Sequence, residues 1–320
     1  MIVVTGGAGF IGSCLVWKLN QLGLDDILVV DHLGRDDKWK NLVGKRFSEY
    51  EDKQRFIERL QAGVYDGTLD GIVHLGACSA TTEADADYLV NNNLHYSQSI
   101  ARWCLAQNVK LWYASSAATY GDGERGYCDD DAATPHFRPL NMYGFSKHLF
   151  DLWVLRNGWQ SRFTGIKFFN VFGPNEYHKA GMRSVIHKAF PAARVIRLFK
   201  SYRPDYADGS QQRDFVYIKD VLDVMAFFFT NPGVAGIFNL GTGQARSWND
   251  VARAMFRALG IDGAIEYVDM PPELQGKYQY FTQADLAKLR QAGCQHQFMP
   301  LEDSVADYLR GYLMQPDQYL

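Results

Sequence analysis

VVTGGAGFIG, residues 3–12, is the stretch that decides the fold of this 320-residue chain. The apolar residues before Gly6 predict a short buried strand, and the pattern of an amphipathic helix follows Gly12. The glycines between them let the backbone turn tightly and approach a ligand closely. The first N–H groups of the helix have no partner within it and carry positive partial charge. The stretch therefore predicts a strand, turn and helix that bind the pyrophosphate of a dinucleotide.

Composition limits the class of protein. The chain is 47% hydrophobic and 22% charged, with a formal net charge of -3, which is typical of a soluble globular protein and gives no reason to expect a nucleic-acid partner. The N-terminus lacks a basic flank and a cleavage site, and no apolar run is long enough to cross a bilayer, so we expect no signal peptide and no membrane partner. Five scattered cysteines predict no metal site and fit the cytoplasm.

A second strand and its acidic end strengthen the dinucleotide prediction. Residues 27–31 form a short apolar run that ends in Asp31, about 20 residues after the last glycine, where a carboxylate holds the adenosine ribose. The alternative is a solvated acid at a strand end. Strands and helices then alternate through the first half of the chain, which predicts an α/β fold with a Rossmann-type doubly wound parallel sheet.

The second half of the chain is expected to form a smaller C-terminal α/β lobe that binds the substrate. We place the dinucleotide-binding domain at residues 1–171, with returning segments near 214–241, and the substrate-binding domain mainly at 172–320. Ligands bind at the carboxyl ends of the strands in such sheets, so the lobe should lie beside those ends.

Two strand ends and one helix pattern mark the rest of the site. Residues 71–77 predict a strand closed by small residues, and Cys78 after it is interpreted as a packing residue rather than a nucleophile. Residues 81–107 predict a helix with three consecutive asparagines at 91–93. Because asparagine is a poor helix former, we expect at least one of them to have a specific hydrogen-bonding role, although a polar helix face would look the same.

Tyr143 and Lys147 are four residues apart on a predicted helix, so both side chains project from one face. A neighbouring ammonium group favours the phenolate and is expected to lower the pKa of the Tyr143 hydroxyl, which makes it a usable acid or base near neutral pH. Ser116, at the end of the preceding predicted strand, is placed to hydrogen-bond the same substrate oxygen.

Together, the glycine turn, Ser116 and the YGFSK motif at 143–147 resemble the extended short-chain dehydrogenase/reductase superfamily over nearly the whole chain. Five further segments are similar to its ADP-L-glycero-D-manno-heptose 6-epimerases: GACSATTE (76–83), YASSAATYG (113–121), RDFVY (213–217), GKYQ (276–279) and FTQADL (281–286). This resemblance implies that the chain inverts C6 of an ADP-heptose with a bound nicotinamide, without net redox change, for the inner core of lipopolysaccharide.

The resemblance also implies two proton-transfer groups, because the two epimers present their hydroxyls in different directions. Tyr143 would serve one epimer and Lys179, after a Gly-Pro turn, the other. Without the resemblance, Lys179 would be interpreted as an exposed loop lysine. The family further implies a homo-oligomer, namely a homopentamer.

The other site residues implied by the resemblance fall into two sets. Those that would bind the cofactor, beside Tyr143, Lys147 and Lys179, are Gly6, Gly9, Phe10, Ile11, Gly12, Asp31, His32, Lys38, Lys53, Leu75, Gly76, Ala77, Cys78, Ser79, Asn92 and Val171. Those that would bind the substrate, beside Ser116, are Asn170, Gly181, Lys188, Phe199, Lys200, Ser201, Tyr202, Arg213 and Tyr278. An insert at 203–210 departs from the commoner family pattern.

The choice of nicotinamide cofactor rests on opposing charges. Asp31 by itself favours NAD, because a carboxylate at the ribose repels a 2′-phosphate. Lys38 and Lys53 match the family's contacts to that phosphate and offset the acid, so we predict NADP, with NAD as the alternative.

Three other functions compete with this prediction. A UDP-sugar 4-epimerase would share the glycine turn, Ser116, Tyr143 and Lys147 but would not require Lys179. A 4,6-dehydratase would carry an Asp-Glu pair where Ala117 and Ala118 stand. A non-catalytic nicotinamide-sensing regulator could use the same fold, although such proteins often lose the tyrosine and lysine pair.

Overall fold

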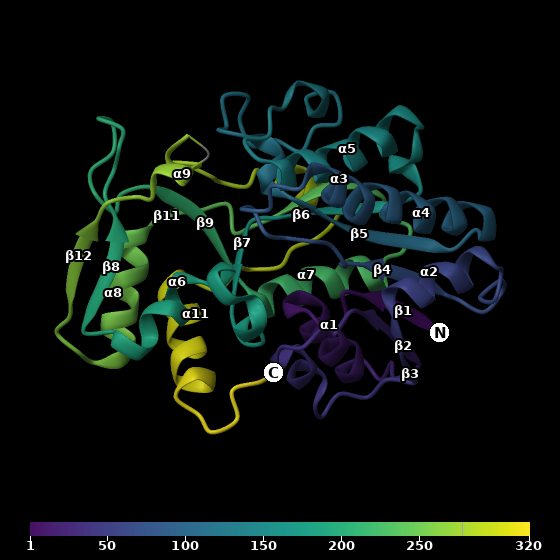
Figure 1. Ribbon diagram of the computed structural model, residues 1–320, viewed down its shortest axis with the longest axis horizontal. Coiled ribbons are helices and arrows are strands. Elements are labelled where there is room, and N and C mark those ends of the chain that lie inside the picture. Colours follow the sequence, from purple (N-terminus) through teal and green to yellow (C-terminus); the bar gives the residue numbers. More distant parts are fainter. Residues whose placement is uncertain (277) are drawn as a thin grey trace.

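The central feature of the fold is a seven-stranded sheet in the order β10-β6-β5-β4-β1-β2-β3, with every neighbouring pair parallel (Figure 1). The computed structural model describes residues 1–276 and 278–320. The strands of this sheet are β1 (Ile2–Thr5), β2 (Ile27–Asp31), β3 (Glu49–Asp52), β4 (Gly71–His74), β5 (Lys110–Ser116), β6 (Thr164–Phe168) and β10 (Gly236–Leu240). The predicted doubly wound parallel sheet is therefore confirmed.

Helices cover both faces of this sheet (Figure 1). The longer helices of the chain are α1 (Phe10–Gln21), α2 (Lys53–Gln61), α4 (Tyr96–Gln107), α5 (Met142–Arg156), α7 (Ile218–Thr230), α8 (Trp248–Leu259) and α11 (Leu301–Tyr308), of which α8 and α11 pack on each other outside this sheet. The shorter ones are α3 (Ala86–Leu89), α6 (Val185–Ala189), α9 (Pro272–Gln275) and α10 (Ala287–Gln291). None of the helices in the described part of the chain has both the length and the apolar character needed to cross a membrane.

The two faces of the sheet bury different residues of the same strands. Val4 of β1 belongs to the apolar core that also contains Leu15 of α1 and Val221 of α7. Its neighbour Val3 belongs to the opposite core, together with Phe56 of α2. Successive side chains of a strand point to opposite faces, so a continuous apolar strand such as β1 must be covered on both sides.

Two small sheets lie outside the main one, in the order β11-β9-β7 and β12-β8. Their strands are β7 (Asn170–Phe172), β8 (Val195–Phe199), β9 (Gln212–Tyr217), β11 (Ala245–Ser247) and β12 (Ala264–Val268). Of the segments expected to return to the main body, β10 joins the main sheet beside β6, whereas β9 pairs with β7. The strand structure breaks at Phe169 between β6 and β7, so β7 leaves the main sheet and pairs with β9. The division into two domains stays a prediction.

The helix expected at 81–107 is also divided. The chain forms α3, then the π-helical turn η2 (Val90–His95), and then α4. The divided helix brings the three asparagines into a widened turn that faces the loop after β4.

Candidate active site

A cavity of about 650 Å³ opens at the carboxyl ends of the central strands. It is lined by the glycine turn, by the ends of β2, β4 and β5, by α5 and by the short turn η6 (Tyr177–Met182). Predicted site residues that line it are Gly6, Gly9, Phe10, Ile11, Gly12, Asp31, Lys38, Leu75, Gly76, Ala77, Cys78, Ser79, Ser116, Tyr143, Lys147, Asn170, Val171, Lys179 and Lys188. The fold thus gathers residues from widely separated parts of the sequence into one cavity.

The glycine turn is shaped for the close approach of a ligand. Gly6 has a φ of +67°, and a Cβ there would lie 2.7 Å from the backbone nitrogen of Gly76. A Cβ on Gly12 would lie 2.0 Å from the carbonyl oxygen of Gly6. No other residue fits these positions without moving the backbone, which leaves the turn free of side chains at the N-terminus of α1. This cradle fits the pyrophosphate of a dinucleotide.

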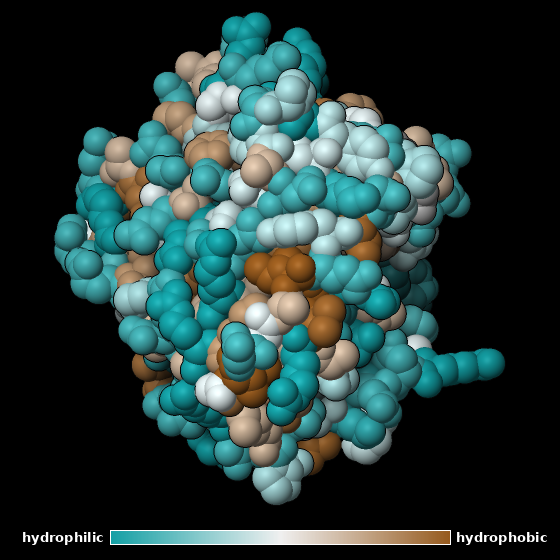
Figure 2. Space-filling view, turned by 90° about the vertical axis from the view of Figure 1, so that its left-hand side faces the viewer, coloured by the Kyte–Doolittle hydropathy of each residue, from teal (hydrophilic) through white to brown (hydrophobic). Residues whose placement is uncertain are grey.

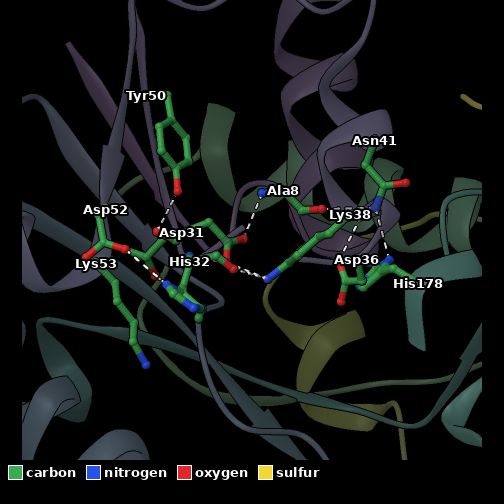
Figure 3. Close-up of polar contacts among 12 residues, drawn as sticks. Ala8, Asp31, His32, Asp36, Lys38, Asn41, Tyr50, Asp52, Lys53 and His178 are labelled. Carbon is green, nitrogen blue, oxygen red and sulfur yellow. Dashed lines mark hydrogen bonds and ion pairs between the residues drawn. The ribbon is translucent and has the colours of Figure 1, made fainter. Parts of the chain in front are cut away.

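Asp31 supports the turn as well as facing the cavity. Its Oδ2 accepts a hydrogen bond from the Ala8 backbone nitrogen at 2.9 Å, and its Oδ1 accepts one from the His32 nitrogen at 2.7 Å (Figure 3). The Lys38 ammonium lies 2.5 Å from the same Oδ1. Asp31 is 7% exposed, so this ion pair is shielded from water on the acid's side. The charge of Asp31 is therefore balanced within the protein.

The η2 turn gives the asparagines their roles. Asn93 is buried, and its Oδ1 accepts a hydrogen bond from the Cys78 nitrogen at 2.9 Å while its Nδ2 donates to the Cys78 carbonyl at 3.0 Å. The same Nδ2 contacts Ser146 on α5. Asn92 accepts from the Lys53 ammonium at 2.7 Å. The expectation that at least one asparagine has a specific role is confirmed.

Tyr143 differs from its prediction in one respect. Burial raises the pKa of the Tyr143 hydroxyl, and the opposing effect of the Ser116 hydroxyl is smaller. The expected lowering by Lys147 is thus wrong for the protein itself, because desolvation disfavours the phenolate more than its neighbours favour it. Burial also lowers the pKa of Lys147 to about 8, and its ammonium donates to the Ala114 carbonyl at 2.9 Å.

Lys179 is directed toward the glycine turn. Its ammonium lies 5.5 Å from the centre of the Phe10 ring, within the range of a cation–π contact. Burial lowers the pKa of Lys179, and Glu176 opposes this shift. The next residue, Ala180, has a φ of 45°, a region that residues other than glycine rarely adopt. Lys179 is therefore held on a strained backbone rather than on a free loop.

A second cavity, of about 1020 Å³, adjoins the first and lies on the side of β8. Lys188, Phe199 and Tyr278 line it, and Trp248 lines both cavities. Figure 2 shows the face of the molecule that carries β8 and β12, where apolar residues gather among hydrophilic ones. Sequence reasoning missed Trp248, because a tryptophan at a helix start is usually a packing residue.

Arg213 contacts Tyr278, a residue that lines the second cavity. It is 5% exposed, and its guanidinium stacks 4.7 Å from the centre of the Tyr278 ring. Within residues 1–276 and 278–320 no carboxylate forms an ion pair with it. Burial lowers the pKa of Arg213. A buried cation without an acidic partner is suited to an anionic ligand.

Several predicted site residues line neither cavity: His32, Lys53, Asn92, Gly181, Lys200, Ser201, Tyr202 and Arg213. His32 contacts Asp52 at 3.2 Å, and Gly181 accepts from Lys188 at 3.4 Å. The insert at 203–210 makes contacts through Arg203, both within itself and with Tyr280. Arg203 pairs with Asp205, and its guanidinium stacks 5.3 Å from the Tyr280 ring.

Comparisons with known proteins identify the family of this chain. A family model described as the NAD dependent epimerase/dehydratase family matches residues 2–241. An ADP-L-glycero-D-manno-heptose-6-epimerase of Nitratidesulfovibrio vulgaris (strain DP4) is 54% identical over 323 residues, which covers 100% of both chains. The solved structure of ADP-L-glycero-D-manno-heptose-6-epimerase from Helicobacter pylori has a TM-score of 0.79 at 27% identity, covering 97% of this chain and 95% of that one.

The UDP-glucose 4-epimerase of Thermus thermophilus, solved as a complex with NAD, has a TM-score of 0.75 at 26% identity, with 97% of this chain and 99% of that chain covered. This 4-epimerase shares the fold of the chain. The heptose epimerase of Nitratidesulfovibrio vulgaris is more similar in sequence, with 54% identity over the whole chain. This chain belongs to the NAD dependent epimerase/dehydratase family and, within it, to the ADP-L-glycero-D-manno-heptose-6-epimerases.

Proposed function

We propose that this chain interconverts ADP-D-glycero-β-D-manno-heptose and ADP-L-glycero-β-D-manno-heptose, with NADP retained in the site, as a step in making the lipopolysaccharide inner core. The observation that carries the proposal is that two proton-transfer side chains, Tyr143 of α5 and Lys179 of η6, line the same cavity as the glycine turn. A nicotinamide bound at this turn would take up hydride from C6 and return it to the opposite face.

Burial shifts the pKa values of the two side chains in opposite directions. A raised pKa keeps Tyr143 protonated at neutral pH, so it can donate a proton to the oxygen at C6. A lowered pKa increases the neutral fraction of Lys179, so it can accept a proton from that oxygen. Groups whose environments separate their pKa values in this way suit paired acid and base roles. Ser116 would hydrogen-bond the same oxygen and hold it in place.

The nucleotide end of the substrate is assigned to the second cavity. Arg213 would bind the diphosphate, because its planar guanidinium presents several donors and is already desolvated. Phe199 and Tyr278 would offer apolar surface to the nucleotide. The similar heptose epimerases are named for an ADP-sugar, which contains both a diphosphate and a nucleotide base.

The preference for NADP is supported by the charges around Asp31. Lys38 balances the acid. Lys53 contacts the neutral amide of Asn92, and in the described residues it has no acidic partner. Because Lys38 and Asp31 balance each other, the remaining positive charge of Lys53 favours a 2′-phosphate over a free hydroxyl. By the family resemblance we also expect a cytoplasmic homopentamer, which sedimentation of the purified protein would test.

The function is tested by following the epimer ratio of ADP-heptose, with UDP-glucose as the competing substrate. Tyr143→Phe and Lys179→Met should each reduce turnover by about 100-fold or more, the usual effect of losing general acid–base catalysis. Lys18→Met, which removes a lysine paired with Asp223 outside the site, is the control. Conversion of UDP-glucose alone would favour the 4-epimerase, and conversion of neither would favour the regulator. Normal turnover of both epimers by Lys179→Met would contradict the two-base scheme.

A further inference from the structure

A single buried side chain connects the glycine turn to the segment that carries Lys179. Asn41 lies in the short helix η1 (Asp37–Leu42) and is 1% exposed. Its Nδ2 lies 2.9 Å from the Ala8 carbonyl oxygen, 3.1 Å from the Asn175 carbonyl oxygen and 3.2 Å from Nδ1 of His178 (Figure 3). Ala8 is part of the glycine turn, whereas His178 directly precedes Lys179. No sequence motif marks Asn41.

The orientation of this amide follows from its partners. A carbonyl oxygen can only accept hydrogen bonds, so the nitrogen of Asn41 must face Ala8 and Asn175. Burial lowers the pKa of His178 to about 4, so its ring is neutral at neutral pH and its Nδ1 can accept. An amide nitrogen suits this place because it is uncharged and carries two hydrogens, one of which is shared between two of the three acceptors. An aspartate of the same shape has no donor and would face two carbonyl oxygens.

The segment around Lys179 needs external support. Asn175 and Ala180 both have positive φ angles, of 73° and 45°, and neither is glycine. Strained backbone persists only where the surroundings determine it. The Asn175 side chain contacts Ser13 of α1 at 3.0 Å, and Asn41 binds the Asn175 carbonyl. The geometry of Lys179 therefore depends on contacts with the first strand–turn–helix unit.

We propose that Asn41 is a positioning residue that couples the glycine turn to Lys179, so that the loop bearing the cofactor phosphates and the loop bearing the second proton-transfer group keep one relative placement. This inference rests on the proposed role of Lys179. Asn41 itself would not contact the substrate.

The chain offers a matched control in Asn20, at the far end of α1 from the turn. Asn20 is also buried, and its Nδ2 also has three acceptors: the Leu24 carbonyl at 3.2 Å, Asp25 Oδ1 at 3.0 Å and the Arg46 carbonyl at 2.8 Å. Asn20→Ala thus removes a similar set of bonds without touching the site. Comparing Asn20→Ala with Asn41→Ala separates a general loss of stability from a misplacement of Lys179.

The first measurement is hydride transfer in a single turnover from each epimer. The epimer whose oxidation fails in Lys179→Met identifies the direction that uses Lys179. Asn41→Ala should slow that direction by about 10- to 100-fold, the effect of a small misplacement of a reacting group, and should slow the other much less. In the Lys179→Met background, Asn41→Ala should add no further loss. Equal slowing in both directions, or an additive effect, would overturn the proposal.

The second measurement is amide hydrogen exchange without substrate. Asn41→Ala should speed exchange at residues 175–182 and in the glycine turn, whereas Asn20→Ala should not. Unchanged exchange in both segments would overturn the coupling. If Asn41→Ala does not fold, Asn41→Asp keeps the shape and removes the donor. Normal turnover by Lys179→Met would refute the two-base function, but the exchange pattern would still decide whether Asn41 couples the two loops.

Discussion

At the scale of single residues, Asp31 has a structural role that differs from the ribose-binding role predicted from its position. Its position after β2 is the one from which a carboxylate binds a ribose. In this chain the same carboxylate accepts hydrogen bonds from the Ala8 and His32 nitrogens and pairs with Lys38. Asp31 thus holds the glycine turn in shape, and its charge is offset before any ligand binds. The preference between NAD and NADP then depends on the lysines nearby.

Removing one of these lysines tests the cofactor preference. Lys53→Ala should weaken NADP binding by about 10- to 100-fold and leave NAD binding nearly unchanged, because a hydrogen bond between charged groups contributes about 1.5–3 kcal/mol. Titration of the cofactor-free protein with each dinucleotide measures this. Lys40→Ala, which removes an exposed lysine paired with Asp37, is the control. An unchanged ratio of the two affinities would contradict the NADP assignment.

At the scale of elements, the η2 turn and the loop after β4 form one unit. The side chain of Asn93 hydrogen-bonds both the backbone nitrogen and the carbonyl of Cys78. It thereby satisfies backbone groups that a neighbouring strand would bind in a sheet. A π-helical turn is often found at functional sites, and here it places Asn93 against the loop after β4. The loop lines the cavity through Leu75 to Ser79.

This unit predicts the effect of Asn93→Ala. Two backbone groups of Cys78 would lose their partner, which should lower the free energy of unfolding by about 1–3 kcal/mol and weaken dinucleotide binding. Urea unfolding and cofactor titration measure the two effects. Asn91→Ala is the matched control, because Asn91 is exposed on the same turn. Equal losses in the two variants would show that the losses come from disturbing the η2 turn and not from removing the Cys78 contacts.

At the scale of the whole molecule, four histidines are held neutral by burial. Burial lowers the pKa of His74 to about 3 and those of His148, His178 and His187 to about 4. His74 has both ring nitrogens occupied, by Thr5 at 2.6 Å and Ser97 at 2.8 Å. A protonated ring would lose its acceptor role there. Protonation of these side chains favours the unfolded chain, so mild acid should lower the free energy of unfolding.

The sign of the pH dependence follows from these shifts. Each folded pKa lies below the usual value of about 6.5, so the unfolded chain binds protons first as the pH falls. The contribution of these histidines to the free energy of unfolding is fully present above pH 6.5 and is lost as the pH falls toward 4. At pH 5.5 the loss from His74 alone is about 1.4 kcal/mol. Urea unfolding at pH 7 and pH 5.5 measures it. His74→Gln should flatten the slope, and His136→Gln, at an exposed site, should not.

The local features of this protein were determined by its sequence. The glycine turn, the strand that precedes it and the spacing of Tyr143 and Lys147 follow from periodicity and backbone freedom, which act over a few residues. The capping box at Ser247, with Asp250 as its partner, is a feature of the same local kind. Such features were predictable because each depends on neighbours in the chain.

The properties that make the site work were decided only by tertiary structure. The ion pair of Asp31 with Lys38, the role of Asn93, the raised pKa of Tyr143 and the bridge at Asn41 all join residues from separate elements. Burial and long-range contact set the charge state of a buried group, and neither is encoded by a short pattern. The sequence therefore determined which groups are present, and folding decided how they are charged and held.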